Sequence, residues 1–257
     1  MSAFFVANFL LLGVISCSNA SSDADERFVS HSDYLIIEEQ DGEFVVTGFI
    51  EENFPADGKI EIPEGVNRII DHLFEYNDTY NFPYETISTP IRSVTIAGSV
   101  KELPFCLFSN NYLEEVILNK GIKIIGSDAF RFNERLESIY MPDGLQVIAN
   151  LAFQGCRGLK SISIPSSVDR IGISAFDYDC WYDVVYVEFR GTKDQWDKIA
   201  KSKDIFDSYS PVTVHCKDGD IENFTGGDET INVVADDYLP RIGFNEVLPG
   251  YDPVSRK

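Results

Sequence analysis

The sequence predicts a β-rich solenoid, a stack of short coils in which each coil repeats one pattern of buried residues. The first observation is a phenylalanine that returns at Phe108, Phe130, Phe153 and Phe176, spaced 22, 23 and 23 residues apart. The second is that apolar residues hold matching places in each interval between these phenylalanines. The third is the short length of the repeating unit, because a unit of this size cannot bury its own apolar side and must stack on a neighbour.

The first twenty residues, 1–20, are expected to be an export signal. Phe4 to Ile15 is an apolar run of 12 residues, which is too short to span a bilayer comfortably and is typical of a signal core. The basic residue that usually lies near Met1 is missing. Ser18-Asn19-Ala20 fits a small-x-small cleavage site, whereas Val14-Ile15-Ser16-Cys17 resembles the lipobox of bacterial lipoproteins, which leaves Cys17 lipidated. Both processing routes stay open, and both predict export.

The coils are expected to fill residues 57–190, with starts near residues 57, 91, 113, 136 and 159 and a last strand over residues 184–190. Each coil has apolar residues at its first, fourth, sixth, tenth and thirteenth places, then a small or apolar residue before the phenylalanine. The coil from residue 57 fits less well and is followed by an excess of 11 residues, around Asn77 to Thr86. In the coil from residue 136 the set is Leu136, Ile139, Met141, Leu145, Ile148, Ala152 and Phe153.

Within a coil, places four to six alternate between inward and outward side chains, as in a short β-strand. Pro142 and Pro165 are expected to stop two of these strands, because proline has no backbone N–H for a ladder. The Ile-Gly steps at Gly126 and Gly172 then turn the chain, and the segment ending in phenylalanine crosses the back of the coil. Stacking therefore predicts a parallel β-sheet on one face, short turns or helical segments on the other, and a phenylalanine column inside.

The consensus IxxxxIGxxAFxxCxxLxxIxIPxxV, over roughly residues 34–219, resembles the leucine-rich repeats of BspA-like bacterial surface antigens. The common leucine-rich repeat has asparagine at its ninth place, where this chain has Gly121, Gly144 and Ser167, so we expect no asparagine ladder. The resemblance implies an α/β-type leucine-rich repeat solenoid. It also implies an N-terminal β-hairpin cap over residues 34–56, after a linker over residues 21–33, and a C-terminal helix–strand cap over residues 191–219.

The closing cap has a local sequence signal as well. Thr192 followed three residues later by Gln195 is a capping box. It predicts a helix that places Trp196 and Ile199 over the open end of the last coil, before a strand around residues 212–214. Residues 220–257 lose the repeat and are expected to form an acidic, mostly disordered tail.

Charge restricts the partners that this chain can have. The 257 residues have a formal net charge of −21, which disfavours binding to nucleic-acid phosphates. Residues 23–65 contain 13 acidic and 2 basic residues, and residues 218–257 contain 9 and 3, so the repeat body is nearly neutral. Acidic ends favour solubility and self-repulsion. We expect a monomer with no nucleic-acid partner, which contacts a membrane only through a lipid on Cys17.

Cysteine usage predicts buried thiols. Apart from Cys17, four cysteines remain, Cys106, Cys156, Cys180 and Cys216, an even number that suits disulfides in an exported protein. Cys156 however stands at the place that the resembled family fills with an inward thiol, and Cys180 lies one place off it. A Cys156–Cys180 bridge is the alternative. No CxxC pair is present, so the spacing predicts no metal site.

Catalytic patterns are missing from the sequence. The three histidines, His31, His72 and His215, lie in different parts of the chain. No GxSxG, HExxH, Walker or dinucleotide-binding glycine pattern occurs. We therefore expect neither enzymatic activity nor a cofactor.

The outward places of the parallel strands form the candidate binding face. Ile117 and Tyr140 are expected to lie exposed side by side, with Tyr186 further along and acidic residues beside them. Exposed aromatic residues on a solenoid face are typical of a protein-binding surface, although single exposed apolar residues are also normal. The candidate partner-binding residues are Glu114, Glu115, Ile117, Glu137, Ser138, Tyr140, Ser161, Ser163, Tyr186 and Glu188.

Two functions remain from the sequence. The first is an exported protein, secreted or attached to the cell surface or outer membrane, that binds a host or neighbouring-cell protein as an adhesion module, as the resemblance implies. The second is a passive structural or scaffold protein of the cell envelope, which the short array and serine-rich columns favour.

Overall fold

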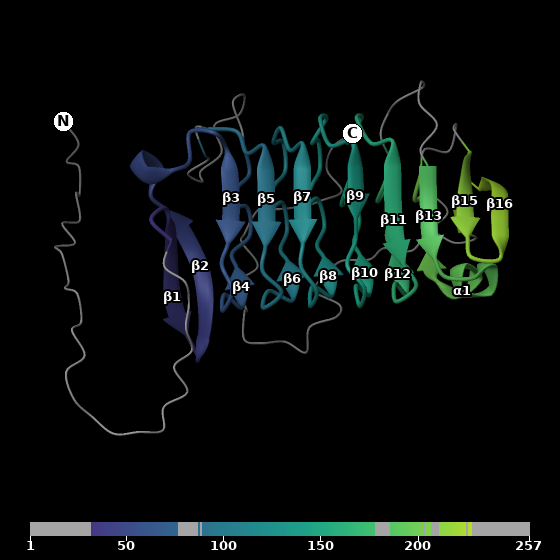
Figure 1. Cartoon of the computed structure of the whole chain (residues 1–257), viewed down its shortest axis with the longest axis horizontal. Coiled ribbons are helices and arrows are strands. Elements are labelled where there is room, and N and C mark those ends of the chain that lie inside the picture. Colours follow the sequence, from purple (N-terminus) through teal and green to yellow (C-terminus); the bar gives the residue numbers. More distant parts are fainter. Residues whose placement is uncertain are drawn as a thin grey trace, which may run out of the picture.

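The structure is a computed structural model that describes residues 32–76, 87, 89–177, 186–202, 204–206, 211–224 and 226–227. Figure 1 shows an elongated stack of coils with a hairpin at one end and a helix–hairpin cap at the other. The predicted solenoid is therefore confirmed. The signal, Cys17, Cys180 and most of the predicted acidic tail lie outside the described residues.

The N-terminal cap is an antiparallel hairpin of β1 (Leu35–Gln40) and β2 (Glu43–Phe49). Its turn residues Asp41 and Gly42 both have positive φ, 53° and 81°, as a two-residue hairpin turn that follows the strand twist requires. Strand β2 also pairs in parallel with β4 (Arg68–Ile69). A 3₁₀ turn over Glu51–Asn53 then leads into the first coil.

The predicted parallel sheet of longer strands runs along one face of the stack. Strands β3 (Lys59–Ile62), β5 (Ser93–Ile96) and β7 (Glu115–Leu118) form one hydrogen-bonded group. A second group begins beside β7 and contains β9 (Ser138–Tyr140), β11 (Ser161–Pro165) and β13 (Tyr186–Arg190), followed by β15 (Val212–Cys216) and β16 (Gly219–Phe224) of the cap. We call this surface the long-strand face.

A second parallel ladder, which the sequence analysis did not predict, lies where only a turn was expected. Two-residue strands pair from coil to coil in the order β6-β8-β10-β12-β14. Two residues are too few to show an alternating pattern, so sequence periodicity cannot reveal them. The strands are β6 (Glu102–Leu103), β8 (Ile124–Ile125), β10 (Val147–Ile148), β12 (Arg170–Ile171) and β14 (Ala200–Lys201).

The third side of each coil, which contains the phenylalanine, is a turn that also hydrogen-bonds to its neighbour. The backbone N–H groups of Cys106, Phe108 and Asn110 donate to carbonyls of the next coil over 2.8–3.1 Å. One residue at the start of each turn is left-handed, with φ between 48° and 58°. These residues are His72, Cys106, Asp128, Leu151 and Ser174, and we call this surface the turn face.

The core is the predicted phenylalanine column. Six phenylalanine rings stack with centroids 5.2–5.7 Å apart and interplanar angles of 5–21°. All six side chains are fully buried, and together with the isoleucine and leucine columns they hold the coils in register. The rings are Phe74, Phe108, Phe130, Phe153, Phe176 and Phe206, the last of which comes from the C-terminal cap.

The expectation of no asparagine ladder was wrong. Asn111 and Asn133 are buried at matching places, three residues after the phenylalanines of their coils. The Asn133 side chain accepts from the N–H of Leu113 (3.1 Å) and donates to the carbonyls of Phe108 and Phe130 (2.9 and 2.8 Å). The ladder was missed because it stands at this place rather than at the ninth place of the common repeat.

The C-terminal cap begins with helix α1 (Lys193–Lys198). The predicted capping box is present, because Thr192 accepts from the Gln195 N–H and the Gln195 side chain accepts from the Thr192 N–H. Trp196 is fully buried against Phe189 and Phe224, with ring centroids 5.1 and 5.4 Å away. Because β16 ends at Phe224, the cap is longer than the predicted residues 191–219. No helix in the described segments is long and apolar enough to cross a membrane.

Candidate functional site

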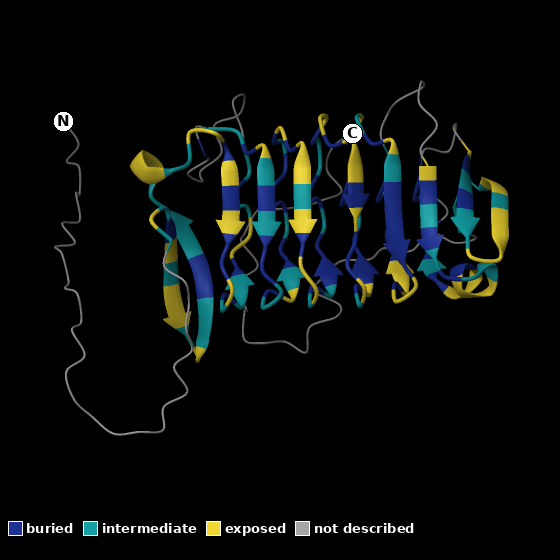
Figure 2. Cartoon of the chain, viewed as in Figure 1, coloured by how far each residue is buried: buried dark blue, intermediate teal, exposed yellow. Residues whose placement is uncertain are grey.

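The predicted columns of the long-strand face are confirmed by the strand register. Tyr140 pairs with Ser163, and Ser163 pairs with Glu188. In the other hydrogen-bonded group of this face, Thr95 on β5 likewise pairs with Ile117 on β7. Figure 2 shows exposed residues on β7 and β9, whereas most of β11 is buried.

Exposure divides the ten predicted residues into three classes. Ser163 is only 7% exposed, because it lies between Tyr140 and Glu188 and donates to the Glu188 carboxylate over 2.6 Å. Its assignment as a surface contact was wrong. Ser161 and Glu188 are half-buried. The residues that are exposed are Glu114, Glu115, Ile117, Glu137, Ser138, Tyr140 and Tyr186.

Tyr140 is held in place by Arg190, which the sequence analysis did not single out. The guanidinium carbon of Arg190 lies 4.2 Å from the centre of the Tyr140 ring. The guanidinium also donates to the Tyr140 hydroxyl and to the Met141 carbonyl, and it forms an ion pair with Asp143 at 3.0 Å. Tyr140 as a whole residue nevertheless stays 61% exposed. Tyr140 therefore presents a fixed aromatic surface to solvent.

The second exposed tyrosine of this face is also stacked. The Tyr186 ring lies against the His215 ring, with centroids 4.4 Å apart and planes 20° from parallel. His215 in turn approaches Asp220 through Nδ1 at 3.0 Å. Tyr186 is 50% exposed and Ile117 is 43% exposed, so three large apolar surfaces lie on one face.

The acidic residues beside these surfaces are largely neutralised by neighbours. Glu114 forms ion pairs with Arg92 (3.2 Å) and Arg135 (3.3 Å), and Glu137 forms one with Lys160 (2.9 Å). Such exposed pairs each stabilise the fold by at most about 1 kcal/mol. The local field of the face is consequently less negative than the sequence count of glutamates indicates.

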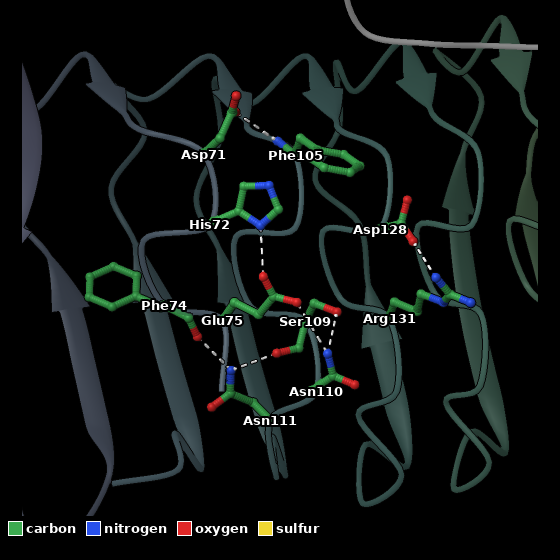
Figure 3. Close-up of polar contacts among 10 residues, drawn as sticks. All are labelled: Asp71, His72, Phe74, Glu75, Phe105, Ser109, Asn110, Asn111, Asp128 and Arg131. Carbon is green, nitrogen blue, oxygen red and sulfur yellow. Dashed lines mark hydrogen bonds and ion pairs between the residues drawn. The ribbon is translucent and has the colours of Figure 1, made fainter. Parts of the chain in front are cut away.

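A different polar group gathers on the turn face of the first coils (Figure 3). The Nδ1 atom of His72 lies 2.7 Å from a carboxylate oxygen of Glu75, whose other oxygen accepts from the Asn110 side chain (3.3 Å). Cys106 lies beside them in the next coil, buried except for 8% of its surface. One coil further, Asp128 pairs with Arg131 at 3.0 Å.

Burial dominates the electrostatics of this group. Burial, together with the carboxylates of Asp128 and Glu75, raises the pKa of the Cys106 thiol far above its ordinary value. Burial also raises the pKa of Asp128, although the Arg131 guanidinium opposes this shift. The cluster thus combines several carboxylates with a neutral thiol in a poorly solvated place.

Comparison with known proteins identifies the type of these repeats. Residues 58–181 match the BspA-type leucine-rich repeat region in six copies. This region belongs to the BspA-type leucine-rich repeat family. A solved structure of a leucine-rich cell surface protein from Faecalibacterium prausnitzii A2-165 is similar to the chain, with 27% identity and a TM-score of 0.52. The similarity covers 67% of this chain and 42% of that one. No curated protein matches the chain.

Both candidate sites overlap the BspA-type repeat region. The turn-face cluster and the Ile117–Tyr140 part of the long-strand face lie inside residues 58–181. Tyr186 and Arg190 lie beyond it, but β13 continues the same parallel ladder from β11. From β9 onward, the long-strand face is therefore one continuous ladder that runs from the BspA-type repeats into the C-terminal cap.

Proposed function

We propose that this chain is an exported, cell-surface protein that binds a protein partner through its long-strand face and catalyses no reaction. The observation that carries the proposal is the fixed, exposed Tyr140 ring beneath Arg190. Exposed Ile117 lies on the neighbouring strand β7, and exposed Tyr186 lies on β13 of the same face, in the adjacent column of residues. The cell-surface location of the similar protein supports the proposed location. Repeat solenoids display surface far more often than they enclose a reaction site.

Rigid aromatic groups suit binding because little conformational freedom remains to be lost. Ordering a mobile side chain at an interface costs about 0.5–1.5 kcal/mol. Tyr140 and Tyr186 already lie in fixed stacks in the free protein, so this cost is reduced at both positions. Tyrosine is also among the residues that most often dominate interface energies.

The test is saturable binding of the labelled chain to intact cells and to purified matrix proteins. Replacing Ile117 and Tyr140 by alanine should weaken binding about 10-fold or more, the effect of losing an anchor of about 1.4 kcal/mol or above. The matched control replaces Ile36 and Ile70, which are also exposed large apolar residues but lie outside the long-strand face. Binding that is non-saturable, or that ignores Ile117 and Tyr140, would instead favour a passive scaffold of the cell envelope.

A further inference from the structure

The turn-face cluster brings three different metal-ligating atoms together. A ring nitrogen of His72, a carboxylate oxygen of Glu75 and Sγ of Cys106 all lie within 4.8 Å of one another. A tetrahedral zinc ion has bonds of about 2.0–2.3 Å, which places its ligand atoms about 3.3–3.8 Å apart. Small side-chain movements therefore suffice to close the three atoms around one ion.

The coil register explains why these residues meet. His72 and Cys106 occupy the same left-handed place in successive coils, with φ of 58° and 53°. The His72 N–H donates to the Phe105 carbonyl (3.0 Å), which stacks the two positions directly. Glu75 follows in the same turn, where its N–H donates to the His72 carbonyl (3.1 Å). The first coil thus contributes His72 and Glu75, and the second coil contributes Cys106.

Neighbouring groups hold the ligands in fixed orientations. The His72 ring packs edge-on against Phe105, with centroids 4.9 Å apart. Asn110 donates to the second carboxylate oxygen of Glu75. Outer groups of this kind orient ligands in metal sites and raise affinity. The His72 and Glu75 side chains are 26% and 16% exposed, so an ion can reach the cluster from solvent.

We propose that His72, Glu75 and Cys106 bind one Zn²⁺ ion, with water as the fourth ligand, and that the Cys106 thiol releases its proton to solvent as the Zn–S bond forms. The set of one sulfur, one imidazole nitrogen and one carboxylate oxygen suits zinc. Calcium and magnesium prefer oxygen ligands alone, so they fit this set poorly. A bound ion would link the first coil to the second, beside the N-terminal cap. This inference does not depend on the proposed partner-binding function.

The first experiment titrates the full chain with CoCl₂ as a spectroscopic probe. Tetrahedral cobalt bound to a thiolate gives a charge-transfer band in the near ultraviolet and intense bands in the visible region. We expect both at one equivalent of cobalt, and we expect one equivalent of ZnCl₂ to abolish them. Cobalt spectra without a thiolate band would overturn the site.

Variants then assign the ligands. Cys106→Ser should abolish the charge-transfer band. It should also weaken zinc binding by more than about 100-fold, because loss of a group that only orients a ligand already costs up to about 100-fold and Cys106 is itself a ligand. His72→Asn should weaken zinc binding similarly, and asparagine tolerates the left-handed backbone. Glu75→Gln provides a third variant if either of these fails to fold, as judged by circular dichroism.

The matched control is the double variant His215→Asn, Cys216→Ser. These residues also combine a histidine, a thiol and a nearby carboxylate, Asp220, but in the C-terminal cap. Zinc affinity and the cobalt spectrum should stay unchanged in this variant. Loss of the thiolate band here, or its survival in Cys106→Ser, would show that the turn-face cluster is only a histidine–glutamate ion pair.

Discussion

At single buried positions in this solenoid, the polar side chain bonds to backbone groups of the adjacent coil. Asn111, Asn133 and Cys156 hold the same place in successive coils, and each donates to a phenylalanine carbonyl of the preceding coil. The Cys156 thiol lies 3.1 Å from the Phe130 carbonyl. Burial raises the pKa of this thiol to about 12, so it stays neutral and unreactive at physiological pH. The prediction of inward thiols is confirmed for Cys106 and Cys156.

Asn133→Ala should lower the free energy of unfolding by about 1–3 kcal/mol, because the buried N–H of Leu113 loses its acceptor. Urea denaturation measures this loss. Asn119→Ala is the control, since Asn119 is exposed and its replacement should change stability by less than about 0.5 kcal/mol. Equal effects of the two changes would contradict a structural role for the asparagine ladder.

At the scale of elements, all three sides of a coil can pair with the next coil, and in the described residues β7 and β9 are the neighbouring long strands that do not. The long strands, the two-residue strands and the turns each supply hydrogen bonds between coils. Very short strands are stable here because the phenylalanine column fixes their register, rather than because of their own length. The open ends of these ladders require caps, since unpaired strand edges promote aggregation.

The C-terminal cap offers a test at this scale. Thr192→Ala removes the side-chain acceptor for the Gln195 N–H and should destabilise α1 by about 1 kcal/mol. Because α1 holds Trp196 over the last coil, the cap should open first, with faster amide hydrogen exchange in β15 and β16. Thr192→Ser retains the acceptor and serves as the control. Exchange that accelerates equally in the N-terminal coils would show that the helix acts on the whole stack.

For the whole molecule, the aromatic core continues from one cap to the other. Phe49 and Phe54 of the N-terminal cap pack on Phe74, and Phe224 of the C-terminal cap packs on Phe206. A solenoid couples each coil only to its neighbours. A defect in the middle of the column should therefore separate the two ends of the stack.

Phe153→Ala is the change that tests this coupling. Phe153 stacks on both Phe130 and Phe176, and its truncation should cost about 3–5 kcal/mol. We expect a lower melting temperature and a broadened or divided transition in calorimetry, because the coils on either side unfold separately. Phe153→Leu fills most of the space and should cost less. A wild-type melting curve for Phe153→Ala would contradict the core assignment.

The repeat period, the phenylalanine column, the capping box and the exposure of Ile117 and Tyr140 were all determined by the sequence. Each depends on residue type and spacing within one coil, which the sequence displays directly. The caps also followed from it, through the resemblance and through Thr192 and Gln195.

Contacts between coils were decided only by the tertiary structure. Arg190 and Tyr140 are 50 residues apart, and the burial of Ser163 follows from the residues of two adjacent strands. The His72–Cys106 column was hidden because the excess residues before Ile91 make that interval longer than the usual 22 or 23 residues. Such contacts join side chains that do not repeat, so they depend on how coils stack rather than on the pattern within any coil.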